Sequence, residues 1–293
     1  MVKKRGNNIN TVIQNKLSLV VNKVFNINTK VLEINIRIII KKIIYSRVWR
    51  TSYNFLNDTK VLEKKISDTL FIFGSGYSLN SISSHEFSLM EKCDTLSFNW
   101  FICQNFLDID FHLIREPSDP NQKTSEFIEE FKGFIKNNKF KNTTYLLQYD
   151  LRAETSIELL SNFVFKEGTS IYGFSTKSRG NKSLPSRDLK GGLIHSAGTL
   201  TDCISFAYAM RYKKIILVGV DLYDRRYFWL NDNETRMADI DRGAKCSHTH
   251  NTADPIINVM KLWVDEFSKN GVELYVYNKK SLLAKYLPVF KFK

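Results

Sequence analysis

Gly74, Ser75 and Gly76 follow an apolar run at residues 69–73 and precede a segment that can begin a helix near Ser78. The β-branched and aromatic run indicates a buried parallel strand, and the two glycines allow a sharp turn after it. Glycines bring backbone N–H groups close to a phosphate or ribose, and a helix start adds a partial positive charge. The pattern is therefore typical of a nucleotide site, although a plain strand–helix turn is the alternative because the third glycine of the dinucleotide fingerprint is missing.

Polar residues also stand at the ends of other expected strands. Asn99 ends a strand over 94–99, Arg115 and Glu116 follow a strand over 110–114, and Asp221 lies near the end of the apolar strand over 213–222. The carboxyl ends of parallel strands meet at one edge of a sheet, where ligands bind. An aspartate at such a position either serves function directly or ties down a neighbouring loop.

Residues 223–254 lie between the strongest strand and the next helix, and their polar composition fits an active-site lid. The segment carries His248 and His250, and an imidazole is the side chain that can act as a general base near neutral pH without perturbation. A surface loop histidine is the alternative interpretation. No metal is expected, since the chain has no Asp-x-Asp motif and His248-x-His250 lacks an obvious third ligand.

These residues must be positioned by an alternation of strands and helices. Further strands are expected over 144–148 and 272–277, and helices over 80–92, 125–140, 195–211, 254–269 and 281–286. Strands separated by helices predict an α/β fold with a mainly parallel sheet flanked by helices. Residues 166–192 lack periodicity and predict a long loop, whose Lys182, Arg187 and Lys190 are either solvated or in contact with an anionic substrate.

Charge divides the chain of 293 residues into two parts. Residues 1–67 contain 14 basic and three acidic residues, which is +11 of the formal net charge of +13. We therefore expect a basic helical extension over 1–67 and a catalytic domain over 68–293, with the lid at about 223–254. A nucleic-acid-binding protein would spread basic residues over its folded core, so no nucleic-acid partner is expected.

Apolar residues recur at helical intervals between residues 10 and 50, with lysines and arginines between them. None of these apolar runs is long enough to span a bilayer. Two interpretations remain: amphipathic helices lying on an anionic membrane, or a helical layer packed on the domain with a solvated basic face. The absence of an apolar block after the basic start and the lack of Cys-x-x-Cys pairs predict a cytoplasmic protein, peripheral at the inner face of the plasma membrane.

Several of these segments together resemble the bacterial lipooligosaccharide sialyltransferases of glycosyltransferase family 42. The matching segments, in chain order, are Gly74–Leu79, Phe98–Asn99, Ser196–Gly198, Tyr212–Tyr223, His248–Thr252, Leu274–Tyr277 and Ser281–Ala284. The resemblance covers about residues 68–293 and implies a Rossmann-like domain that uses a CMP-activated nine-carbon acid sugar. It also implies inversion at the anomeric centre, without a metal or other cofactor, and transfer to a cell-surface glycan or glycolipid acceptor.

The resemblance assigns roles to individual residues. It implies that His248 is the general base and that Tyr223 and Tyr227 donate hydrogen bonds to the departing phosphate. The residues implied to bind the donor, together with the strand-end Asp221, are Gly74, Ser75, Gly76, Asn99, Glu116, Ser118, Ser196, Gly198, Thr199 and Asp221. Tyrosine hydroxyls can stabilise a leaving phosphate in a partly dry site. Packing of the two tyrosines within an aromatic lid is the alternative.

Three departures from the family pattern concern the sugar end of the donor. Glu116 replaces an asparagine, Ala197 replaces a hydroxyl residue, and Ile194 and His195 replace an arginine. These departures make CMP-Kdo or another ulosonic acid an alternative donor.

A nucleotide-dependent hydrolase is a further alternative, but Gly76-Tyr-Ser lacks the lysine of a phosphate-binding loop. A homo-oligomer is also compatible with the sequence.

Overall fold

The computed structural model describes residues 29–115, 124–137, 140–150, 153–178, 183–196, 198–223, 226–230 and 249–292. Within these ranges eight strands form one sheet in the order β1-β6-β5-β4-β3-β2-β9-β10, and neighbouring strands run parallel. The strands are β1 Asn54–Leu56, β2 Thr69–Phe73, β3 Asp94–Phe98, β4 Phe111–Ile114, β5 Thr144–Gln148, β6 Ser170–Phe174, β9 Lys214–Val218 and β10 Glu273–Val276. The predicted α/β fold with a mainly parallel, helix-flanked sheet is confirmed.

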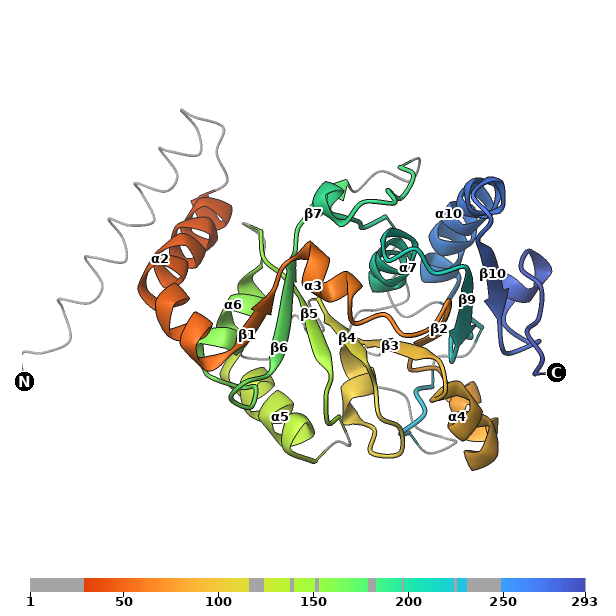
Figure 1. The fold of residues 1–293 in the computed structure, drawn as a ribbon, viewed down its shortest axis with the longest axis horizontal. Helices are drawn as coiled ribbons and strands as arrows, with labels where there is room; N and C mark the ends of the chain where they lie inside the picture. The colour runs from red at the N-terminus through yellow and green to blue at the C-terminus, as the bar shows by residue number, and fades with distance from the viewer. Residues whose placement is uncertain are drawn as a thin grey trace, which may run out of the picture.

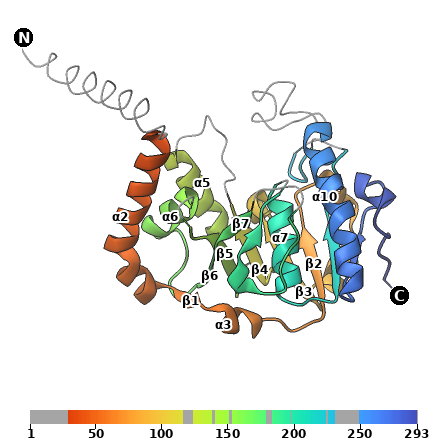
Figure 2. The same ribbon diagram turned by 90° about the horizontal axis from the view of Figure 1, so that it is seen from above.

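Helices cover both faces of this sheet (Figure 1 and Figure 2). The helices are α2 Thr29–Ser52, α3 Asp58–Leu62, α4 Ser84–Met90, α5 Thr124–Asn137, α6 Glu154–Ser161, α7 Thr199–Ala209 and α10 Thr249–Lys269. Short 3-10 helices are η1 Tyr77–Ser81, η2 Asn99–Cys103, η3 Leu189–Gly191 and η4 Leu282–Lys285, and a small separate sheet pairs β7 Thr176–Ser178 with β8 Leu193–Ile194. No helix within the described ranges is both long enough and apolar enough to cross a bilayer.

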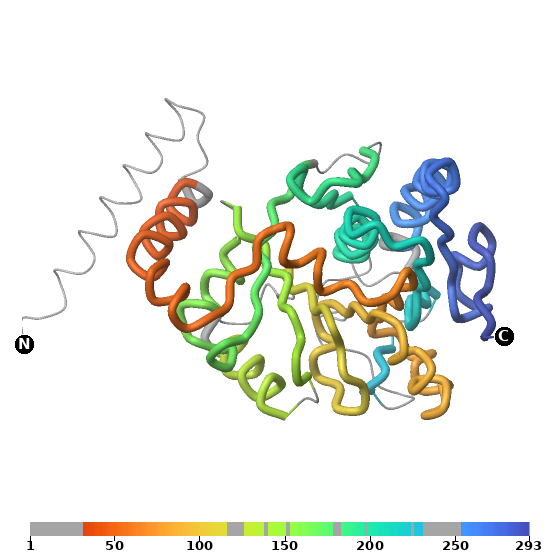
Figure 3. Tube along the Cα trace, in the orientation of Figure 1, coloured from red at the N-terminus to blue at the C-terminus, as the bar shows by residue number. Residues whose placement is uncertain are grey.

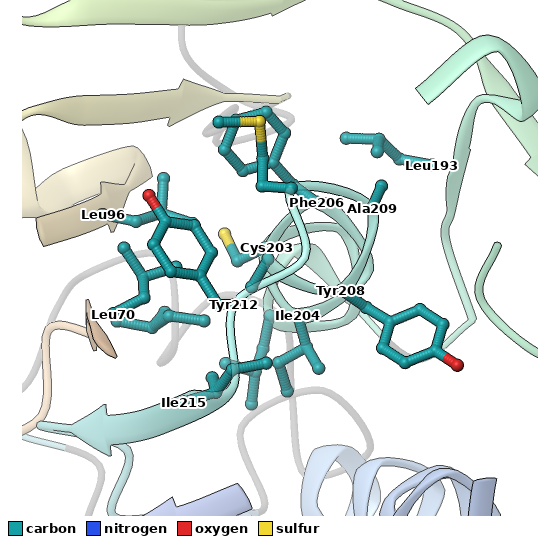
Figure 4. Close-up of a cluster of buried hydrophobic side chains, with 14 of the residues drawn as sticks. Leu70, Leu96, Leu193, Cys203, Ile204, Phe206, Tyr208, Ala209, Tyr212 and Ile215 are labelled. Carbon is teal, nitrogen blue, oxygen red and sulfur yellow. The ribbon is translucent and has the colours of Figure 1, made fainter. Parts of the chain in front are cut away.

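The strand β2 shows why the sheet is buried on both faces. Its side chains alternate, so that Leu70 and Ile72 join the core beneath α7 and α10, whereas Phe71 and Phe73 join the core beneath α4, α5 and α6. A strand covered on both sides reads as a continuous apolar run, as residues 69–73 do. Figure 4 shows the first core, in which Cys203 and Phe206 of α7 lie among side chains of neighbouring strands.

The N-terminal part of the described chain is joined to this domain. Trp49 and Ile38 of α2 are buried against the second core, and Lys41 Nζ lies 2.5 Å from Glu158 Oε1 of α6. After α2, the strand β1 pairs with β6 at the edge of the sheet. The extension predicted over 1–67 therefore contributes a strand to the sheet, because residues 54–56 find an unpaired edge there.

The prediction of a long loop over residues 166–192 is wrong. This region contains β6, β7 and η3, and β6 lies inside the sheet between β1 and β5. The strand β6 was not predicted because it is only five residues long. The glycine, serine and charged residues around it dominate the composition of the region. The helix predicted over 80–92 is divided, because Ser83 and Glu86 form a capping box that begins α4 after the separate η1.

Candidate functional site

The order of the strands changes direction between β2 and β9. Along the chain the sheet grows from β2 to β6 in one direction, and β9 then pairs with the other side of β2, as the colours in Figure 3 show. At such a switch point the connections leave the carboxyl ends of the two strands towards opposite faces, and ligands bind in the gap between them. The turns at Gly74–Gly76 and Gly219–Asp221 border this position.

The two turns are in close contact. Gly74 N donates to Val218 O at 2.8 Å, and Gly76 N donates to Gly219 O at 2.8 Å. A Cβ atom on Gly74 would lie 2.6 Å from Gly219 O, and one on Gly76 would lie 2.5 Å from Asp221 Oδ2. Glycine is therefore required at both positions, because the backbone of this turn lies against the backbone that follows β9. The expectation that these two N–H groups face a phosphate is wrong, because both are donated to the end of β9.

Asp221 ties three segments together. Its side chain is 3% exposed, Oδ2 accepts the N–H of Ser78 at 2.9 Å, and Oδ1 accepts Nδ2 of Asn278 at 2.8 Å. The carboxylate thus occupies the positive end of η1, where an anion was expected from the sequence. Of the two interpretations of this aspartate, the structure supports the one that ties down neighbouring loops.

The segment 226–230 lies against the glycine turn. Phe228 N donates to Ser75 O at 3.1 Å, and Tyr227 forms an antiparallel bridge with Gly76. The Tyr227 ring stacks on Trp229 with centroids 4.6 Å apart. The other tyrosine, Tyr223, is 40% exposed, and its hydroxyl accepts a hydrogen bond from Asn278 Nδ2 at 3.3 Å. Both tyrosines predicted to contact the donor therefore lie at the carboxyl ends of β2, β9 and β10.

Asn99 connects β3, β4 and α7. Its φ of 48° is in the left-handed region, which asparagine tolerates better than most residues. Oδ1 accepts the N–H of Arg115 at 3.1 Å, and Nδ2 donates to Thr199 Oγ1 at 3.0 Å. Two residues predicted to bind the donor, Asn99 and Thr199, are thus in direct contact. A non-glycine residue held in this conformation is a feature that clusters at functional sites.

A buried charged cluster lies behind this contact. Arg115 Nη1 is 2.8 Å from Asp202 Oδ1, and His195 Nδ1 is 2.6 Å from Asp202 Oδ2. The side chains of Arg115 and Asp202 are 3% and 0% exposed, whereas that of His195 is 25% exposed. Sequence reasoning missed this cluster, because Arg115 and Asp202 are 87 positions apart and no motif spacing joins them.

The structure assigns most of the predicted site residues to one edge of the sheet, in two neighbouring groups. The group at β2 and β9 contains Gly74, Ser75, Gly76, Asp221, Tyr223 and Tyr227, and the group at β3 and α7 contains Asn99, Ser196, Gly198 and Thr199. Since β2 pairs with β3, the groups are adjacent. Glu116, Ser118 and His248 lie outside the described residues, as does Lys182 of the predicted substrate-contacting loop.

No protein-family model matches the chain, and no curated protein sequence is similar to it. One similar solved structure is the monofunctional alpha-2,3-sialyltransferase Cst-I from Campylobacter jejuni. The sequence identity is 15%, the TM-score is 0.46, and the match covers 78% of this chain and 83% of that one.

Proposed function

We propose that the protein is an inverting, metal-independent glycosyltransferase that transfers a sialic acid or a similar ulosonic acid from a CMP-sugar to a cell-surface glycan. The observation that supports this proposal is the convergence of residues far apart in sequence at the β2–β9 switch point. Gly76 and Tyr227 form a bridge there, and Asn99 contacts Thr199 beside them. A Kdo transferase that uses CMP-Kdo is the alternative with the same site.

The proposed reaction is a single displacement. The acceptor hydroxyl oxygen forms a bond to the anomeric carbon while the bond from that carbon to the phosphate oxygen breaks, and CMP leaves with the bonding electrons. His248 takes the proton of the attacking hydroxyl, and the Tyr223 and Tyr227 hydroxyls donate to the leaving phosphate. On the N-terminal side of residue 248, the segment 226–230 is held at the carboxyl end of β2, where Phe228 N donates to Ser75 O.

Transfer assays with purified protein test the proposal directly. Truncated lipooligosaccharide is incubated with CMP-N-acetylneuraminic acid or CMP-Kdo in the presence of EDTA, and both released CMP and the mass of the acceptor are measured. Turnover with one of these donors, undiminished by EDTA, is expected. Failure to transfer either sugar to any of a panel of lipid-linked glycans, or transfer that EDTA abolishes, would contradict the proposal.

The outer face of α2 supports peripheral contact with an anionic membrane through residues 1–50. This face exposes large apolar side chains that make up a row along the helix: Leu32, Ile36, Ile39, Ile40, Ile43, Ile44 and Val48. Ile43 is 73% exposed, and Arg47 and Arg50 are exposed on the same helix. An apolar face with basic neighbours is suited to the headgroup region of an anionic bilayer. Such a position would bring the enzyme close to lipid-linked acceptors.

The direction of α2 is consistent with this arrangement. Helices that precede a strand of a parallel sheet run opposite to it, so α2 and α10 begin on the side of the carboxyl ends. Figure 2 shows their first turns on the same side of the molecule. The apolar row, called the α2 face below, therefore starts on the side where the candidate site opens.

Vesicle sedimentation tests the α2 face. Replacing Ile39 and Ile43 by aspartate should weaken binding to vesicles with anionic lipid by at least about tenfold, because each buried isoleucine contributes about 1.5 to 3 kcal/mol. Leu262→Asp, at a 38% exposed position of α10, is the matched control. Unchanged vesicle binding of the double variant would instead assign this face to packing within the chain. A dimer in solution that the double variant no longer forms would assign it to packing between copies of the chain.

A further inference from the structure

A groove lies beside the edge strand β10, outside the candidate site. Its volume is about 570 Å³, and it is lined by residues of α4, by Tyr277 and Lys279 after β10, and by residues 289–292. Pockets that bind small ligands fall between about 300 and 1,000 Å³ and combine apolar walls with a few polar groups. The groove agrees with this description both in size and in the residues that line it.

Three half-buried aromatic rings line the groove, and they are held in place by the fold. The ring centroids of Phe290 and Phe292 are 5.2 Å apart, and those of Tyr277 and Phe292 are 6.2 Å apart. The Tyr277 hydroxyl donates to Glu86 of α4, and Phe290 N donates to Val276 O of β10 at 2.8 Å. Because the rings are fixed before a ligand arrives, a ligand that packs on them loses little free energy in ordering them.

The groove also carries positive charge. Lys279 and Lys291 are exposed in its lining, and in the part of the chain that the structure describes neither ammonium group has an ion-pair partner. Glu86 lines the groove as well, but its carboxylate already accepts hydrogen bonds from the Tyr277 hydroxyl and from the N–H and hydroxyl of Ser83. The two lysines therefore leave a net attraction for an anionic ligand.

Asn278 connects the groove to the candidate site. This residue stands between Tyr277 and Lys279, and its Nδ2 donates to Asp221 Oδ1 at 2.8 Å and to the Tyr223 hydroxyl at 3.3 Å. The groove thus begins one residue away from a contact with the tyrosine that is proposed to hold the leaving phosphate. A ligand that extends from the candidate site past β10 would meet the aromatic rings and the two lysines.

We propose that this groove binds the part of the acceptor glycan that lies away from the reacting hydroxyl, and that it favours glycans carrying phosphate groups. This inference rests on the proposed function. The C–H faces of sugar rings can pack on the aromatic rings, and the two ammonium groups can form charge-assisted hydrogen bonds to a phosphate. An acceptor without phosphate would keep only the first kind of contact.

Binding of an oligosaccharide tests the groove without the transfer reaction. The phosphorylated core oligosaccharide of lipooligosaccharide, before and after treatment with a phosphatase, is titrated into the unmodified protein and into Lys279→Gln/Lys291→Gln. The matched control is Lys269→Gln/Lys285→Gln, at exposed positions outside the groove. Loss of the groove lysines should weaken binding of the phosphorylated form about tenfold and that of the phosphatase-treated form less than about twofold. The control should change neither affinity.

The aromatic rings are tested by a second pair of variants. Phe292→Leu keeps an apolar side chain but removes a ring of the groove, so it should weaken binding of both forms of the oligosaccharide about threefold. Phe163→Leu, at a 45% exposed position outside the groove, is the control and should weaken neither. CMP binding should be unchanged in all of these variants.

Hydrogen–deuterium exchange locates the bound oligosaccharide. The phosphorylated form should slow exchange in peptides that cover residues 84–90 and 276–292. No binding of this form, protection confined to other peptides, or equal affinities of the lysine variant and its control would overturn the groove, whether or not the protein transfers a sugar. If the oligosaccharide protects these peptides but neither donor is turned over in the transfer assay, the proposed function and the acceptor role fail together.

Discussion

The carboxylate of Asp221, after β9, accepts the backbone N–H of Ser78, in the helix that follows β2, at 2.9 Å. These residues are 143 positions apart, and their contact closes the turn on which the candidate site is built. The same carboxylate holds Asn278 beyond β10. One side chain thus fixes the ends of three neighbouring strands relative to each other.

Replacing Asp221 by alanine should lower the free energy of unfolding by about 2 kcal/mol, because Ser78 N and Asn278 Nδ2 lose a buried acceptor. Asp221→Asn keeps an acceptor oxygen and should cost less. Urea unfolding measures both, with Asp265→Ala at an exposed position of α10 as the control. Equal stability of Asp221→Ala and the control would show that this contact does not hold the turn.

Alanine at Gly76 and at Gly133 should have opposite effects. A Cβ on Gly76 would lie 2.5 Å from Asp221 Oδ2 and 2.7 Å from Gly219 O, so Gly76→Ala should destabilise the protein by about 1 to 3 kcal/mol. Gly133 lies within α5, and a Cβ there meets no atom within 4 Å. Gly133→Ala should therefore stabilise the protein by about 0.5 to 1 kcal/mol through helix propensity. Thermal unfolding distinguishes them, and a neutral Gly76→Ala would refute the close packing of the two turns.

The buried His112 predicts loss of stability in mild acid. Burial lowers the pKa of His112 to about 3 from its ordinary value of 6.5, and its Nδ1 lies 2.7 Å from Ser97 Oγ. Between these two pH values the unfolded chain binds a proton that the folded chain does not, so the contribution is complete above about pH 6.5 and is lost as the pH falls.

Between pH 7 and pH 4.5 this single group should remove about 2 to 3 kcal/mol from the free energy of unfolding. His112→Leu removes the titrating group, so its stability should fall less over the same interval, whatever its stability at pH 7. Urea unfolding at both pH values gives the difference. Equal losses in the two proteins would mean that His112 is protonated in the folded state.

Tyr227→Phe should lower kcat about a hundredfold in the transfer assay, because the leaving phosphate loses one hydrogen-bond donor. The ring can still stack on Trp229, so the loss of kcat should be large relative to any change in the melting temperature. Tyr286→Phe, which alters a 42% exposed tyrosine at the end of η4, is the matched control. An unchanged kcat would reduce Tyr227 to a packing residue of the aromatic segment.

Much of the fold followed from sequence patterns because the strands on both sides of the switch point are continuous apolar runs. Residues 69–73 and 214–218 are buried on both faces, and no other arrangement hides such runs as well. The strand β6 was missed because tertiary pairing between β1 and β5 stabilises a short segment that has weak local signals.

The sequence also indicated which edge of the sheet carries the candidate site, since Asn99, Arg115 and Asp221 all follow strands. It could not show how these side chains are used. Gly76 and Asp221 contact each other instead of leaving a free anion site, and Arg115 turns inward to Asp202. Such pairings depend on the relative placement of strands, which residue spacing does not encode.

Hydrogen–deuterium exchange with and without saturating CMP tests the central claim most directly. CMP should slow exchange in peptides that cover residues 74–81, 96–103 and 195–202, at the carboxyl ends of the strands, and leave α2 unchanged. The amino ends of β5 and β6 provide the contrast, because a cavity there is lined by Lys64, Lys141 and Lys166 and could attract the same anion. Protection confined to residues 140–145 and 166–170, or none anywhere, would contradict a nucleotide site at the β2–β9 switch point.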